Sequence, residues 1–140
     1  MPWCYLRFYL QTHNFPDPDA IASGFGLQYF LKVHGVESDI CYDGKIDKLS
    51  TKKMFEVFGI SAKSKDEIGD MKPDDYIVVV DAQKLNANLT DFIGDEVACI
   101  DHHPTFKGCE YQYKDIRIVG ACSSIIGDYF RQIETELPEN

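Results

Sequence analysis

Side chains that can bind metal ions stand directly after three stretches of this sequence that favour β-strands. These stretches are Trp3–Thr12, Tyr76–Val80 and Val97–Ile100. The imidazoles and carboxylates that follow them are His13, Asp17, Asp19, Asp81, Asp101, His102 and His103. If the strands are parallel, their carboxyl ends meet at one edge of a sheet, which is where ligands bind in open α/β folds.

The types of these side chains indicate which ion they could hold. Carboxylates gathered in a partly dry site repel each other by several kcal/mol unless cations lie between them. Oxygen and imidazole ligands without thiolate suit Mn²⁺, Mg²⁺, Co²⁺ or Fe²⁺ better than a structural zinc ion. One shared carboxylate could hold two such ions about 3.5–4 Å apart, an arrangement that hydrolyses phosphate esters. The pattern therefore predicts a metal site with hydrolytic chemistry.

Each candidate also has an ordinary structural explanation when it is taken alone. Asp17 is a good N-cap for the helix that follows it, and Asp19 could oppose the dipole of that helix. Asp81 could form a turn after its strand, and a single His13 is typical of a loop. The joint pattern, with hard ligands after three strands, favours the metal site over these separate explanations.

The rest of the chain alternates between patterns typical of strands and of helices. Asp17 and Pro18 suit the start of a helix that runs to Lys32 or His34 and stops at Gly35. The other expected elements are a strand over Ser38–Tyr42, a helix over Asp47–Phe58, a charged connection over Lys63–Asp75, an edge strand over Tyr111–Val119 and a helix over Gly120–Ile133. The alternation predicts an α/β fold, a doubly wound open sheet that is mainly parallel, with helices on both faces.

Composition fits one folded domain. The chain has 140 residues, of which 44% are hydrophobic, and no apolar run approaches the roughly 18–20 residues of a membrane span. The opening stretch has no basic start and no small-residue cleavage site, so we expect a first strand there and no signal peptide. Five cysteines without a CxxC pair suit reduced thiols in a cytoplasmic protein.

The formal net charge of −9 limits the expected partners. It argues against a broad nucleic-acid-binding face and fits a protein that concentrates carboxylates for cations. We therefore expect no long duplex nucleic acid and no membrane among the partners. A nucleic-acid substrate would have to be short.

Four segments resemble, in order, the motifs of the DHH family of phosphoesterases. The segments are 13–23 (HNFPDPDAIAS), 79–81 (VVD), 101–103 (DHH) and 120–126 (GACSSII). The resemblance extends over residues 12–130. The family includes single-strand exonucleases, short-oligoribonucleotide and phosphoadenosine phosphatases, cyclic-dinucleotide phosphodiesterases and manganese pyrophosphatases.

The resemblance implies two metal sites that share one residue. His13, Asp17 and Asp81 would hold one ion, and Asp19, Asp81 and His102 would hold the other. Asp81 would therefore bridge the two ions. The expected cofactor is a pair of Mn²⁺ ions, with Mg²⁺ or Co²⁺ as alternatives.

The resemblance also implies roles for residues outside the metal sites. His103 would contact the substrate phosphate or steady the leaving group, so that it counts with Asp81 and His102 as catalytic. Asp101 would support the histidines. Ser23, Ser123 and Ser124 could contact a substrate phosphate at helix starts, and capping or close packing is the alternative for them.

Two features of the family have no counterpart in this sequence. One is a fourth motif, a late Asp that completes the second metal site, and neither Asp115 nor Asp128 matches it. The other is a glycine-rich C-terminal domain that selects the substrate. We therefore expect residues 1–140 to be a DHH catalytic domain without these parts. A sheet edge left unpaired in this way could join two chains in a homodimer.

The expected function is hydrolysis of phosphate esters of nucleotides or short oligonucleotides by a water that two metals activate. A manganese-dependent inorganic pyrophosphatase is the alternative within the same chemistry. A non-catalytic sensor module that binds metal or nucleotide is a further alternative, which the missing fourth Asp favours. His102, His103 and the Asp17–Asp19 pair argue against the sensor, because binding alone has less need of an activated water.

Overall fold

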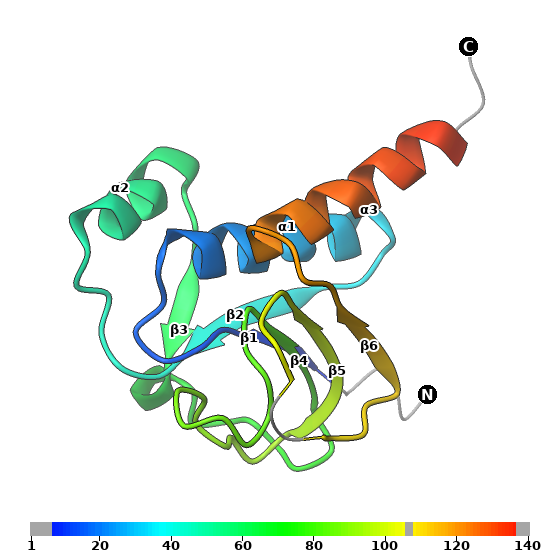
Figure 1. The fold of residues 1–140 in the computed structure, drawn as a ribbon. Coiled ribbons are helices and arrows are strands. Elements are labelled where there is room, and N and C mark those ends of the chain that lie inside the picture. Colours follow the sequence, from blue (N-terminus) through cyan, green and yellow to red (C-terminus); the bar gives the residue numbers. More distant parts are fainter. Residues whose placement is uncertain (1–6, 106–107, 137–140) are drawn as a thin grey trace.

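The computed structural model describes residues 7–105 and 108–136, in which six strands form one open sheet (Figure 1). The strands are β1 (Phe8–Gln11), β2 (Ser38–Tyr42), β3 (Ala62–Ser64), β4 (Tyr76–Val80), β5 (Asp95–Asp101) and β6 (Tyr113–Ile116). The helices are α1 (Pro18–Val33), α2 (Leu49–Phe58), α3 (Cys122–Glu136) and the short 3₁₀ helix η2 (Lys65–Glu67).

The sheet is parallel between every pair of neighbours, in the order β3-β2-β1-β4-β5-β6. The chain builds outward from β1 to β3, returns to place β4 beside β1, and then builds outward in the other direction. The predicted α/β class and the open parallel sheet are confirmed. The order of the strands reverses between β1 and β4, which makes the carboxyl ends of these two strands the expected ligand-binding edge.

One face of the sheet packs against the three α-helices of the described chain. Leu10, Ile40 and Ile100 from the strands are buried there against Ile21 of α1 and Ile125 of α3. Half-buried side chains of α2 contribute to the same cluster. The first half of the chain reaches this face because a right-handed crossover places α1 and α2 on the same side of the sheet.

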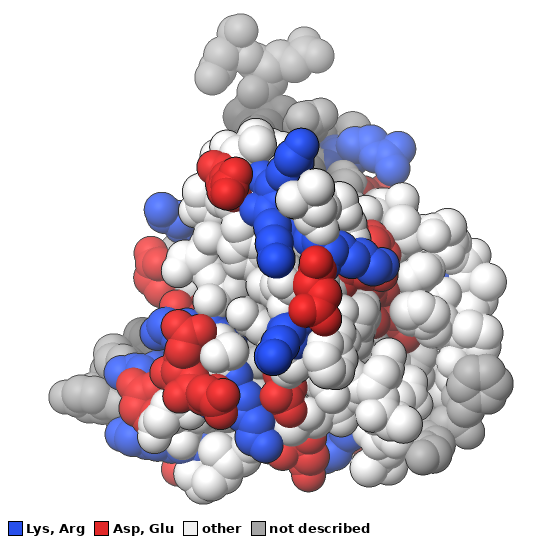
Figure 2. Space-filling model, turned by 90° about the vertical axis from the view of Figure 1, so that its left-hand side faces the viewer, with Lys and Arg blue, Asp and Glu red and all other residues white. Residues whose placement is uncertain are grey.

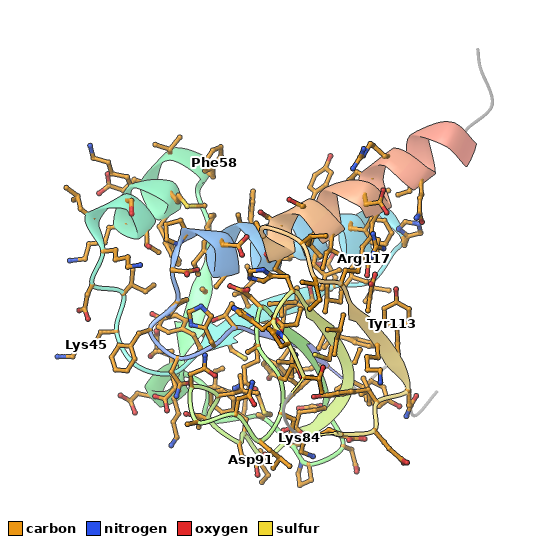
Figure 3. All side chains as sticks on the ribbon, viewed as in Figure 1. Lys45, Phe58, Lys84, Asp91, Tyr113 and Arg117 are labelled. Atoms are coloured by element: carbon orange, nitrogen blue, oxygen red, sulfur yellow. The ribbon has the colours of Figure 1, made fainter. Side chains whose placement is uncertain are left out.

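The other face is covered by irregular segments rather than by α-helices. Its buried cluster joins Tyr9, Ile77 and Val79 to Ala82 and Phe92 of the connection between β4 and β5. Lys84 and Asp91, on the same connection, lie on the side of the sheet away from the three helices (Figure 3). The expected helices are therefore present on one face only of the described structure. The β4–β5 connection carries two asparagines and other turn-forming residues, which favour local turns over a helix.

The observed limits of the elements agree best with the predicted limits in the interior strands. β2 and β4 have the predicted limits. The predicted connection Lys63–Asp75 instead contains the end of β3 and all of η2, which starts with a capping box between Ser64 and Glu67. The first six residues of the chain, which fall in the predicted strand Trp3–Thr12, lie outside the described residues.

The surface carries both signs of charge in close mixture. On the side that Figure 2 shows, Lys and Arg side chains are interspersed with Asp and Glu. Within the described residues, no helix has the length and apolar character needed to cross a membrane.

Candidate metal centre

Asp81 lies between two pairs of side chains, each made of one histidine and one aspartate. Its Oδ2 is 3.5 Å from His13 Nε2, and its Oδ1 is 3.0 Å from His102 Nε2. His13 Nε2 is also 3.6 Å from Asp17 Oδ1, while His102 Nε2 is 3.6 Å from Asp19 Oδ2. The structure thus brings together the five residues expected as metal ligands. Ligand atoms of His13, Asp17 and Asp81 lie close enough to share an ion, and so do those of Asp81, Asp101, His102 and His103.

The conformation and burial of Asp81 are unusual for a charged residue. It follows β4 with a φ of 59°, in the left-handed region that few residues other than glycine, asparagine and aspartate adopt. Its side chain is 2% exposed, and among the described residues Oδ1 has no hydrogen-bond partner, although His102 Nε2 lies 3.0 Å away. Burial raises the pKa of the Asp81 carboxyl. A buried carboxylate oxygen without a partner fits a bound cation.

Both histidines of the cluster are oriented by backbone carbonyls. His13 Nδ1 donates to Asn14 O at 2.8 Å, and His102 Nδ1 donates to Val119 O at 3.0 Å. Each ring therefore turns Nε2 toward the carboxylates, as in the histidine ligands of metal proteins. Without a cation, the hydrogen bond with Asp81 raises the pKa of His13 to about 9.

The two aspartates of the first α1 turn also have structural partners. Asp17 is the N-cap of α1, and its Oδ1 accepts the N–H of Ala20 at 2.9 Å. Asp19 Oδ2 and Oδ1 accept the N–H groups of Cys122 and Ser123, at the start of α3, at 3.0 Å each. Burial raises the pKa of Asp19, but these two hydrogen bonds, together with the Ser123 side chain and nearby His102, outweigh it and hold the pKa below its ordinary value. Asp19 therefore joins the two helices at the metal centre.

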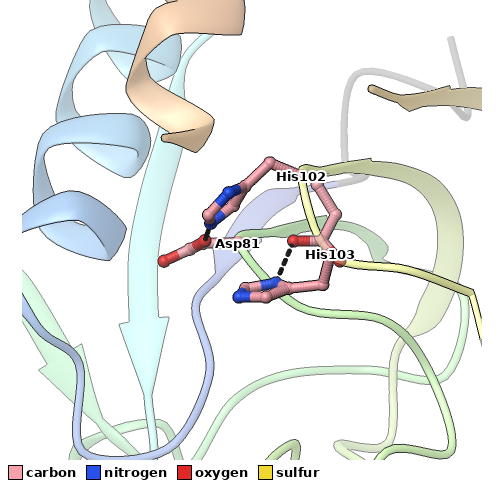
Figure 4. A group of neighbouring side chains, drawn as sticks. Asp81, His102 and His103 are labelled. Atoms are coloured by element: carbon pink, nitrogen blue, oxygen red, sulfur yellow. Dashed lines mark hydrogen bonds and ion pairs between the residues drawn. The ribbon is translucent and has the colours of Figure 1, made fainter. Parts of the chain in front are cut away.

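His103 is held by a buried network of its own. Its Nδ1 donates to Asp101 Oδ1 at 2.7 Å, and Gln83 Nε2 donates to Asp101 Oδ2 at 2.8 Å and to His103 O at 3.0 Å. Asp101 is fully buried, while the His103 side chain is 47% exposed. Figure 4 shows His102 and His103 extending from the same strand end toward Asp81. Asp101 thus orients His103, whereas Val119 orients His102.

Gln83 is a residue of the site that the sequence did not indicate. A single glutamine after a strand end carries no motif, and its role depends on a strand that lies 18 positions further along the chain. Only the tertiary structure places it between Asp101 and His103.

The serines expected at helix starts lie in different surroundings. Ser23 is fully buried, and its hydroxyl donates to Asp19 O at 2.7 Å, which favours the packing alternative for it. Ser123 is half-buried with its N–H bound to Asp19, and Ser124 is exposed. Contact of Ser123 or Ser124 with a substrate phosphate stays a prediction.

Comparison with known proteins adds a family and several relatives. The model of the DHH family, N-terminal domain, matches residues 7–139. An uncharacterized protein of Methanocaldococcus jannaschii is 33% identical over 132 residues, which are 92% of this chain and 27% of that protein. Probable manganese-dependent inorganic pyrophosphatases of Streptococcus thermophilus and Streptococcus pyogenes are 24% and 26% identical. The matches cover 96% and 91% of this chain and 44% and 42% of those proteins.

A solved structure shares the fold. The crystal structure of an exopolyphosphatase-related protein from Bacteroides fragilis superposes with a TM-score of 0.68 at 17% identity. The superposition covers 91% of this chain and 39% of that one. The chain thus spans less than half the length of each of these relatives.

Proposed function

The chain belongs to the DHH family, and we propose that it is a metal-dependent phosphohydrolase in which Asp81 would contribute to the binding of two divalent cations. The observation that carries the proposal is the position of the Asp81 carboxylate, whose two oxygens face two separate His–Asp pairs. Mn²⁺ is the proposed ion, because mixed imidazole and carboxylate ligands suit it and two of the relatives are described as manganese-dependent.

Different residues of the chain would bind each of the two cations of the proposed centre. His13 and Asp17 would hold one cation and His102 and Asp19 the other, each histidine through Nε2. When bound, two divalent cations supply a water of lowered pKa as the nucleophile and offset negative charge on the phosphoryl oxygens. The hydrogen bonds from Nδ1 keep both imidazoles in the tautomer that leaves Nε2 free to bind.

His103 is the proposed contact to the substrate. Its Nδ1 is engaged by Asp101, so Nε2 remains for the phosphate or for the leaving oxygen. The ring is partly exposed and lies 4.1 Å, centroid to centroid, from the ring of His102. A proton carried at Nε2 could therefore be delivered to an alkoxide as it leaves.

The proposed substrates are phosphate esters of nucleotides or short oligonucleotides. The net charge of −9 and the mixed surface charges of Figure 2 support a small substrate rather than a long polyanion. Inorganic pyrophosphate is the second candidate, and the similarity to the two Streptococcus proteins favours it. A cytoplasmic location also stays a prediction, which the free thiols of Cys41, Cys99, Cys109 and Cys122 support.

A hydrolysis assay distinguishes the candidates. The purified chain is incubated with Mn²⁺ and either the dinucleotide pApA or inorganic pyrophosphate, and the products are separated by ion-exchange chromatography. We expect cleavage of pApA that Asp81→Asn abolishes. Asp95→Asn, which changes an exposed aspartate at the other end of the sheet, is the control.

Two results would replace this proposal with another one, and a third would contradict it. Cleavage of pyrophosphate alone would make the second candidate the function. Metal binding without hydrolysis of either compound would support the sensor alternative. Hydrolysis that persists in Asp81→Asn would contradict the proposed centre.

A further inference from the structure

Phe15 is an exposed aromatic residue between two of the proposed metal ligands. It lies two positions from His13 and two from Asp17, so its Cα is within about 7.6 Å of the Cα of each. Its side chain is 59% exposed, and its φ of 52° is in the left-handed region, which aromatic residues rarely adopt. Strained residues cluster at functional sites, so this position calls for a functional explanation.

The ring of Phe15 rests on the backbone of Gly44. A Cβ at Gly44 would lie 2.9 Å from each of three ring atoms, Cγ, Cδ1 and Cε1. Gly44 also has a φ of 82°, which makes glycine the preferred residue there for a second reason. The N–H of Phe15 donates to Asp43 O at 3.0 Å. The side of the ring that carries Cγ, Cδ1 and Cε1 is thus supported by Gly44, and the exposed area belongs to the other ring atoms.

Two neighbouring loops hold the loop that carries Phe15. The N–H of Asn14 donates to Asn88 O at 2.7 Å, and Asn14 Oδ1 accepts the N–H of Thr90 at 3.2 Å. Thr90 Oγ1 in turn donates to Asp43 Oδ2 at 2.6 Å. Phe15 is therefore fixed in its strained conformation beside the metal centre by contacts to both neighbouring loops.

Beside Gly44 the surface opens into a hollow of about 660 Å³ at the carboxyl ends of β2 and β3. Charged side chains of both signs line it, and so do apolar and hydroxyl side chains; the lining residues are Tyr42, Gly44, Lys45, Ile46, Lys52, Phe55, Glu56, Ser64 and Asp66. Figure 3 shows Lys45 extending from the connection between β2 and α2. Charged side chains of both signs, beside the apolar surfaces of Tyr42, Ile46 and Phe55, suit the hydroxyl groups and the base of a nucleoside better than they suit a bare phosphate.

We propose that Phe15 is a stacking platform for the base of a nucleotide whose phosphate lies at the metal centre, with the nucleoside directed toward this hollow. The inference rests on the proposed function and narrows it to nucleotides as the substrate class. Stacking on an aromatic ring accepts every base, so the platform selects nucleotides over pyrophosphate without selecting one base.

The test compares two ligands that differ only by the base. Binding of AMP and of ribose 5-phosphate to the Mn²⁺-loaded chain is measured by calorimetry for the wild type, Phe15→Leu and Phe15→Trp. We expect the wild type and Phe15→Trp to bind AMP about tenfold more tightly than ribose 5-phosphate, and Phe15→Leu to bind both equally. Phe58→Leu is the matched control, because Phe58 is also 59% exposed but lies on α2 (Figure 3).

A second variant tests the support of the ring. Gly44→Ala leaves Phe15 in the chain but introduces a methyl group where the ring lies, so it should also reduce the preference for AMP. Mn²⁺ binding by Phe15→Leu at the wild-type affinity would show that the centre is intact in the variant.

The inference is overturned if the wild type binds the two ligands equally, if neither binds, or if Phe15→Leu keeps the preference for AMP. Hydrolysis of pApA is measured with the same protein preparations. A preference for AMP without any hydrolysis would retain the platform and refute the proposed phosphohydrolase. Hydrolysis without a preference for AMP would support the proposed phosphohydrolase and refute the platform.

Discussion

At the scale of single residues, the conformation of Asp81 links the fold to the proposed chemistry. Left-handed backbone at a residue other than glycine costs about 1–3 kcal/mol and persists only where the surrounding structure imposes it. The N–H of Asp81 donates to Ile100 O of the neighbouring strand at 2.9 Å, which fixes the turn. The turn directs one carboxylate oxygen to each His–Asp pair, so the strain has an explanation if each oxygen binds a separate cation.

Replacement of Asp81 by asparagine tests this explanation with little change of shape. We expect Asp81→Asn to lower the affinity for Mn²⁺ by at least about 100-fold, because even residues that only support metal ligands change affinity by 10–100-fold. Calorimetric titration measures the effect, with Asp95→Asn as the control. Unchanged Mn²⁺ binding by Asp81→Asn would show that the ion binds elsewhere.

Gln83 offers a test of the network behind His103. Gln83→Leu keeps the size of the side chain but removes both hydrogen bonds, to Asp101 and to the carbonyl of His103. We expect kcat to fall by about 10–100-fold and the free energy of unfolding to fall by about 1.5–3 kcal/mol. Urea unfolding and hydrolysis assays measure the two effects.

Gln28→Leu is the matched control for Gln83→Leu. It removes one hydrogen bond, to Ser38 O at 2.8 Å, far along α1 from the metal centre. We expect it to reduce stability without reducing kcat. Equal losses of kcat in the two variants would mean that Gln83 acts through stability alone.

The candidate site was predictable from the sequence where its residues directly follow predicted strands. The five proposed ligands follow two strands near the switch point and a third beside them, and all are hard ligands, so their order and spacing were sufficient to predict that they lie together. The partners of Asp19 were not predictable, because the N–H groups that it accepts lie more than 100 positions away in α3. Gln83 was missed for the same reason, since only the pairing of β4 with β5 brings it to Asp101.

At the scale of the elements, an ionic network joins β6 to α3. Arg117 donates from Nε and Nη2 to the two oxygens of Asp115, at 2.8 and 3.0 Å, and from Nη1 to Asp128 at 2.9 Å. Tyr129 donates to Asp115 at 2.6 Å. The two aspartates that do not match the fourth motif thus have a structural role, which holds the last helix against the edge of the sheet.

The network predicts how stability depends on pH. Burial raises the pKa of Asp115, but the hydrogen bonds from Arg117 and Tyr129 outweigh it and lower the pKa from its ordinary value of 3.8. Because the pKa is lower in the folded state, the carboxylate stabilises the fold above pH 3.8, and the contribution is lost as the pH falls through the lowered value.

Asp115→Asn measures this contribution. We expect it to reduce the free energy of unfolding by about 1–2 kcal/mol at pH 7, a modest value because Arg117 is partly exposed. The difference from the wild type should shrink as the pH is lowered toward 3. Asp74→Asn, at an exposed position, should show no such dependence. A constant difference at all pH values would contradict the ionic explanation.

The elements themselves were predictable where burial imposes a pattern. β2 and β4 lie inside the sheet, and their apolar runs set their limits. β3 is a short edge strand without a fully buried side chain, so its sequence carries no such pattern. The absence of α-helices from the second face of the described structure follows from the turn-forming residues of the β4–β5 connection, which the overall alternation of strand and helix patterns does not reveal.

At the scale of the whole molecule, the sheet has two short edges. β3 and β6 contain three and four residues, and short edge strands are one way in which proteins avoid pairing with other chains. Pairing of two chains through an edge stays a prediction, expected only at high concentration. Light scattering over a concentration series tests it, and a monomeric mass throughout would contradict it.

The geometry of the metal centre predicts two unequal binding steps. Both oxygens of Asp19 already accept backbone N–H groups, so a cation beside His102 must compete with those hydrogen bonds. Among the described residues, the contacts of Asp17 with Ala20 and with His13 are both to its Oδ1, which leaves more freedom for a cation beside His13. We therefore expect the ion beside His13 to bind first and the ion beside His102 to bind more weakly.

Titration of Mn²⁺ into the metal-free chain separates the two steps. His13→Ala should remove the tight step and His102→Ala the weak one. At a free Mn²⁺ concentration of 100 times Kd, the tight site should stabilise the fold by about 2.7 kcal/mol and raise Tm by roughly 10 °C. A chelator should reverse this shift. A single step that His102→Ala removes and His13→Ala leaves intact would contradict the order and place the stronger site at the start of α3, where Asp19 would then have to exchange its backbone partners for the ion.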